Sequence, residues 1–156
     1  MKKVIIFIFL ILTIVFILPA DLFAQKESML VIFPFAGSSI ENGNLIASKF
    51  SYQDFISSMF LVARIRIDTS FFFHRDGSND IEVMLTMGKQ FGASYILIGS
   101  ISLSDGQNSV LLEFFNAESR LKIAQELIVF ESFDDIDAFV PDIDKKFTEA
   151  VMLDRE

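Results

Sequence analysis

The hydrophobic pattern predicts a sheet built around two strands that are buried on both faces. Residues 29–33 (Met-Leu-Val-Ile-Phe) and 95–98 (Tyr-Ile-Leu-Ile) are uninterrupted apolar runs, as expected of strands covered on both sides. After residue 98 the pattern alternates, with Ile101 and Leu103 on one side and serines on the other. We therefore expect the two segments to lie side by side, the second emerging from the core into a hairpin.

Alternating segments predict three further strands with one exposed face. Residues 61–68 are apolar at the odd-numbered positions. After the turn signal Asp105-Gly106, residues 110–114 alternate, and residues 116–119 turn the chain again. Residues 94–130 are thus expected to form an antiparallel meander. The positions expected to share one face of its last strand are Leu121, Ile123, Leu127 and Val129.

Helical spacing appears in three places between and after these strands. Residues 45–60 fit one broken helix or two short ones, following a stretch at 36–44 with the composition of a loop. Asn79 and Glu82 have capping-box spacing, and Gly92 stands where a left-handed helix terminator belongs. A last helix is expected after a second capping box, Ser132 and Asp135, with a kink or restart at Pro141.

The order of these elements defines the expected fold. It is β-α-β-α-β-β-β-α, which predicts an α/β (α+β-like) class with a single mixed sheet of about five strands covered by helices. The length of 156 residues fits one domain. We place that domain at residues 25–156.

The first 24 residues have the layout of a secretory signal peptide. Lys2 and Lys3 precede a stretch at 4–18 that is apolar apart from Thr13, and Ala24 offers a small residue for cleavage. The alternative is an uncleaved membrane anchor, although the stretch is short for a span of about 20 residues. Export to the periplasm is expected in either case, with anchoring to the inner membrane if the segment is retained.

Composition narrows the classes of partner. The chain has no Cys, which excludes a disulfide framework and a lipid-bearing cysteine. Removal of residues 1–24 would take two basic residues and one acidic residue from a chain of net charge −8, leaving −9. Such an acidic domain is a poor partner for nucleic acid or an anionic membrane surface. Contact with a membrane is therefore expected only through the N-terminal segment.

Two motifs resemble a known group of bacterial envelope domains. Leu30-Val31-Ile32-Phe33-Pro34-Phe35 and Gly92-Ala93-Ser94-Tyr95-Ile96-Leu97-Ile98-Gly99-Ser100-Ile101 are similar to strands of the TolB amino-terminal-like fold, which includes CsgG-like and LpoB-like proteins. Ser94 stands where that group usually has Asp. The resemblance covers about residues 28–153 and specifies a fold more than a task. It implies a non-enzymatic domain for protein–protein contacts in translocation, secretion-pore assembly or activation of wall synthases.

Two candidate sites follow from local composition. Gly37, Ser38 and Ser39 lie between a strand and a helix, where backbone N–H groups can cradle a phosphate. This loop lacks the Gly-Lys-Ser/Thr ending, so an ordinary capped loop is the competing interpretation. A partner surface is predicted at Phe71, Phe72 and Phe73, because three adjacent rings cannot all face one core; the alternative is local packing beside the sheet.

Arg64 and Arg66 project from the polar face of their strand and offer a second partner contact, or simply a solvated face that discourages sheet-to-sheet association. No catalytic set, metal site or cofactor is predicted: the only His is His74, and nothing near it has ligand spacing. The sequence therefore predicts an exported, non-enzymatic interaction domain with a protein partner in the envelope. The alternative is a membrane-anchored sensor that binds a small ligand near residues 37–44.

Overall fold

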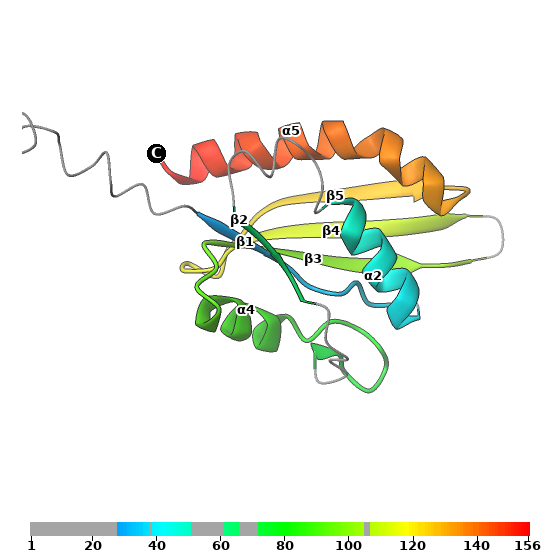
Figure 1. Cartoon of the computed structure of the whole chain (residues 1–156), viewed down its shortest axis with the longest axis horizontal. Coiled ribbons are helices and arrows are strands. Elements are labelled where there is room, and N and C mark those ends of the chain that lie inside the picture. The colour runs from blue at the N-terminus through cyan, green and yellow to red at the C-terminus, as the bar shows by residue number, and fades with distance from the viewer. Residues whose placement is uncertain (1–27, 38, 51–60, 66–71, 105–106) are drawn as a thin grey trace, which may run out of the picture.

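The computed structural model describes residues 28–37, 39–50, 61–65, 72–104 and 107–156. The elements that these residues form in full are five strands, three α-helices and the 3-10 turn before the last helix, arranged in layers (Figure 1). The strands are β1 (Met29–Ile32), β2 (Leu61–Arg64), β3 (Tyr95–Ser102), β4 (Asn108–Asn116) and β5 (Lys122–Phe130). The helices are α2 (Ile40–Lys49), α4 (Ile81–Gln90) and α5 (Ile136–Asp154), the last preceded by the 3-10 turn η3 (Phe133–Asp135).

The sheet has the order β2-β1-β3-β4-β5. β1 is parallel to both of its neighbours, β2 and β3, and its Val31 lies opposite Ile96 of β3. β4 is antiparallel to β3, and β5 is antiparallel to β4. This arrangement confirms the mixed five-strand sheet, the contact between the two buried strands and the meander. It also leaves β2 and β5 as the two outer strands.

Each face of the sheet carries its own core. Side chains of β1, β3 and β4 pack with α2 and α5 on one face, while the opposite face packs against α4. Among the described helices, α4 contacts β3, and Phe115 of β4 is buried in the same core, but none of the residues of that core comes from β5. Leu127 and Val129 of β5 are consequently 59% and 43% exposed.

A stack of three aromatic rings joins the sheet to α5. Phe114 of β4 lies parallel to Tyr95 of β3, with ring centroids 5.6 Å apart, and parallel to Phe147 of α5 at 4.7 Å. All three side chains are buried. Because aromatic pairs stabilise beyond their buried area, we expect this stack to help hold α5 on the meander.

Two of the predicted helix boundaries are confirmed, and two differ from the prediction. Gly92 is left-handed, with φ of 82°, and ends α4 as expected; Ser132 and Asp135 form the expected capping box. The N-cap of α4, however, is Asp80 rather than Asn79, whose amide instead donates to Ser100 Oγ at 2.9 Å. Furthermore, α5 continues through Pro141 as one helix and does not restart there.

The stretch at 36–44 is only partly a loop. α2 already begins at residue 40, so the expectation of a loop as far as residue 44 is wrong. The glycine at position 43 suggested a loop, but Gly43 lies inside the helix, where it is required by close packing. A Cβ at that position would lie 2.3 Å from the carbonyl oxygen of Phe35, so only glycine lets α2 cross the chain this closely. Residues 51–60, the second half of the expected helical stretch, lie outside the described residues.

The faces of β5 also differ from the expectation. The pairing between β4 and β5 shifts at Phe114 and Phe115, leaving Ile123 as an extra residue. This bulge turns Ile123 toward the α5 side of the sheet, while Leu127 and Val129 face the uncovered side. The side chains of Ile128 and Phe130 are the ones buried beneath α5.

Candidate functional site

The loop predicted to hold a phosphate is engaged in the fold. Gly37 has φ of 85° and lies against β3, where an added Cβ would be 2.0 Å from the Ile101 carbonyl oxygen. The hydroxyl of Ser39 caps α2 by accepting from the Asn42 N–H at 3.2 Å. Ser38 lies outside the described residues. Gly37 and Ser39 thus have structural roles, and a ligand role for this loop stays a prediction.

The aromatic triplet is divided between core and boundary. Phe72 is buried and packs edge-on against Phe33, with ring centroids 4.8 Å apart. Phe73 is half-buried beside the same cluster, and Phe71 lies outside the described residues. The position of Phe72 matches the alternative of local packing beside the sheet, and a partner role for the triplet stays a prediction.

Of the two arginines proposed for partner contact, Arg64 is a described residue, and the partner role of the pair stays a prediction. Arg64 is half-buried at the end of β2, where it pairs in register with Ile32. Arg66 lies outside the described residues. His74 Nδ1 is 3.8 Å from Asp80 Oδ2. The described residues hold no group of three potential metal ligands.

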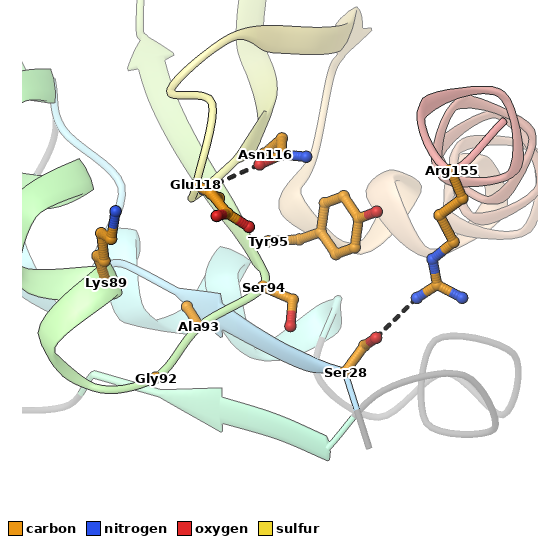
Figure 2. A pocket seen from close by; sticks show the side chains of 9 residues that line it. All are labelled: Ser28, Lys89, Gly92, Ala93, Ser94, Tyr95, Asn116, Glu118 and Arg155. Carbon is orange, nitrogen blue, oxygen red and sulfur yellow. Dashed lines mark hydrogen bonds between the residues drawn. The ribbon is translucent and has the colours of Figure 1, made fainter. Parts of the chain in front are cut away.

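A polar pocket of about 400 Å³ lies at the amino ends of β1 and β3 (Figure 2). We call it the basal pocket; it is lined by Ser28, Lys89, Gly92, Ala93, Ser94, Tyr95, Asn116, Glu118 and Arg155. Tyr95 Oη donates to Asp154 Oδ2 at 3.2 Å, and Asn116 donates to the same oxygen at 2.6 Å. Arg155 donates to Ser28 Oγ at 2.7 Å and lies over the Tyr95 ring.

The charges of the basal pocket do not converge on one point. Lys89 and Arg155 stand on opposite sides of it, with Glu118 between them (Figure 2). The polar groups of Tyr95 and Asn116 are already bonded to Asp154. These contacts hold the C-terminal end of α5 against the sheet. We therefore interpret the basal pocket as the place where α5 is attached to the sheet.

The phenol of Tyr95 is expected to ionise late. Burial raises its pKa above the usual value of 10.0, outweighing the opposite effect of Arg155. Because the pKa of Tyr95 is higher in the folded state, the protonated phenol stabilises the fold. This contribution to the free energy of unfolding is complete below pH 10 and is lost as the pH rises through the folded-state pKa. An absorbance titration should resolve one late tyrosine of the two in the chain, and Tyr95→Phe should remove that step; a late step that survives the substitution contradicts this assignment.

A groove runs along the outer side of β5 beneath α5. It consists of three adjoining hollows of about 260, 460 and 460 Å³. The first shares Val129 and Phe139 with the second, and Lys146 with the third. We call it the edge groove. Its strand side is lined by Ile123, Ala124, Glu126, Leu127, Ile128, Val129, Phe130 and Glu131, and its helix side by Phe139, Asp142, Ile143, Lys146, Glu149, Ala150, Leu153 and Asp154, with Gln107 and Asp135 at one end.

The edge groove combines exposed apolar side chains with an acidic rim. Phe139 and Leu153 of α5 are 41% and 72% exposed. The groove's basic side chain, Lys146, is paired with Glu126. The remaining carboxylates on its rim are Glu131, Asp135, Asp142, Glu149 and Asp154. The edge groove thus has an apolar floor that is bordered by carboxylates.

The sequence did not single out this groove. Its signal is the unbroken apolar run Leu127-Ile128-Val129-Phe130 in a strand otherwise expected to have one wet face. Apolar residues at both parities indicate that both faces of a strand are covered. Only the sheet order reveals that this strand is an outer one.

Comparison with solved structures identifies the fold. No protein-family model and no curated protein sequence matches the chain. TolB from Acinetobacter baumannii superposes with a TM-score of 0.54 at 12% identity, over 81% of this chain and 29% of the TolB chain. The chain has a TolB-like fold. This confirms the resemblance seen in the motifs, at the level of structure.

Two further solved structures are similar to this TolB-like domain at lower TM-scores. Lipoprotein GNA1162 from Neisseria meningitidis gives 0.46 at 10% identity, over 69% of this chain and 81% of that one. The LpoB C-terminal domain from Salmonella enterica gives 0.42 at 14% identity, over 72% and 90%. Within the residues that the structure describes, no helix is both long enough and apolar enough to cross a membrane.

Proposed function

We propose that the chain is an exported, non-enzymatic accessory protein of the bacterial envelope that acts by binding another protein during periplasmic assembly or transport. Three features support this proposal: the export-type N-terminus, the TolB-like fold, and the apolar surface at β5. The last of these carries the most weight, because it is a property of this chain and not of a relative.

The apolar surface at β5 is more than scattered exposure. Leu121, just before the strand, is 66% exposed, and Leu127 and Val129 follow on the uncovered side of the sheet. Phe139 and Leu153 continue the exposure across the groove. Leu127, Val129 and Phe139 line one hollow together, and contiguous apolar surface of this kind marks interaction sites in soluble proteins. A protein partner accounts for it directly.

The alternative of a small-ligand sensor has less support. That hypothesis places the ligand at residues 37–44, but Gly37, Ser39 and Gly43 are each committed to close packing or helix capping. The basal pocket offers volume, yet Tyr95 and Asn116 are occupied with Asp154. A protein-binding role therefore uses the surfaces that the fold leaves open.

The test is purification of the tagged chain, expressed with its own N-terminus, after gentle cross-linking of intact cells. We expect recovery of a specific envelope protein, and a mature amino terminus at Gln25 if the signal is cleaved. A matched sample of an unrelated exported protein of similar charge controls for non-specific capture. Failure to recover any specific protein would overturn the proposed function.

A further inference from the structure

We propose that the edge groove binds an extended segment of a partner protein, carrying alternating apolar and basic side chains, as an added strand beside β5. This inference rests on the proposed function and names the surface and the chemistry of its partner. It is drawn from three independent properties of the groove: its open backbone edge, its length and its charge.

The first property is the open edge of β5. β5 pairs with β4 on one side, and no other described strand pairs with it. Four consecutive residues, 126–129, line the groove together; side chains of a strand alternate between faces, so the strand's own backbone edge forms this wall. An outer strand presents N–H and C=O groups to which an extended peptide can bond.

The second property is size. β5 has nine residues, which corresponds to about 30 Å at the usual rise of a strand. The three hollows follow it from Ile123 to Glu131. Side chains on one face of an added strand would lie beside Leu127 and Val129, and those on the other face would meet Phe139 and Leu153 of α5. Both faces of such a strand therefore have apolar neighbours.

The third property is charge, and it decides the kind of partner. The pairing of Lys146 with Glu126 neutralises one carboxylate, while Asp142, Glu149 and Glu131 keep the rim acidic. A second copy of this chain, of net charge −8, would bring acidic rim to acidic rim if two β5 strands paired. Lys or Arg side chains interleaved with apolar ones complement the rim instead.

Synthetic peptides test this proposal directly. The probe is a fluorescent nine-residue peptide of alternating Val and Lys, titrated with the exported protein in fluorescence anisotropy. We expect saturable binding that weakens at least tenfold when Lys is replaced by Glu, and that is lost when alternate backbone nitrogens are methylated. Raising the NaCl concentration should weaken it, because the rim charges are solvent-exposed. Absence of binding, or equal binding of the Lys and Glu peptides, overturns the proposal.

Charge-reversal variants locate the site. Asp142→Lys combined with Glu149→Lys should weaken peptide binding at least tenfold without unfolding the protein, since both residues are exposed on α5. Glu41→Lys, an exposed position on α2, is the matched control and should leave binding unchanged. Equal loss in the control, or a concentration-dependent dimer abolished by Val129→Lys, would contradict the choice of a basic peptide as occupant.

The same variants separate this inference from the proposed function. If cross-linking recovers the envelope partner equally well with the double variant, the edge groove is not its binding site, although the interaction role stands. If no partner is recovered with the unmodified chain, the interaction role itself fails.

Discussion

Replacing Phe114 with alanine should lower the free energy of unfolding by about 3–5 kcal/mol, the usual cost of removing a buried phenylalanine ring. Phe114 is fully enclosed and stacks on both Tyr95 and Phe147. Its loss leaves a cavity and removes two ring contacts at once. Domains of this size are stable by about 5–15 kcal/mol, so urea denaturation followed by circular dichroism should show a much earlier midpoint.

The control for this substitution is Phe139→Ala on α5. The Phe139 ring is partly exposed and lines the edge groove, so its removal should change stability by about 1 kcal/mol or less. Equal destabilisation by the two variants would mean that the aromatic stack does not hold α5 to the sheet.

Gly43→Ala should destabilise the protein by about 1–3 kcal/mol, the cost of forcing extra atoms into a packed site. Elsewhere in a helix the same change is expected to stabilise by up to about 1 kcal/mol. The sign reverses here because the new Cβ would lie 2.3 Å from the Phe35 carbonyl oxygen, and backbone cannot swing aside as a side chain can. Thermal or urea denaturation measures the difference.

Asn44→Ala, at the next position of α2, is the matched control. Alanine is the better helix former, and Asn44 Oδ1 is buried without a hydrogen-bond partner among the described residues. The control should therefore keep or raise stability. A stabilising Gly43→Ala would show that α2 does not cross residue 35 as closely as described.

The buried strands could be predicted because their signal is local. Residues 30–32 and 95–98 are apolar at every position, and such runs require cover on both faces whatever the remainder does. The capping box at Ser132 and Asp135 and the terminator Gly92 are likewise short-range patterns with their own stereochemistry. Local patterns of this kind are enough to predict the element order and the class of the sheet.

The errors share a different cause, which is contact between distant segments. Gly43 cannot carry a side chain because the Phe35 carbonyl oxygen lies too close. Asn79 does not cap α4 because its amide donates a hydrogen bond to Ser100 of β3. The bulge that leaves Ile123 unpaired is a property of two strands together. The edge groove likewise depends on which strand lies outermost and on where α5 rests above it, so no stretch of sequence contains it.

The contact between Arg155 and Ser28 has a consequence for how the molecule can be held. The first described residue and the penultimate one meet at 2.7 Å, and both lie at the opposite end of the sheet from Ser102 and Asn108 (Figure 1). Chain segments that leave the domain at Ser28 and at Arg155 therefore start from the same end of the sheet. β5 begins near this end and runs to the opposite end of the sheet, so its open edge extends away from both attachment points.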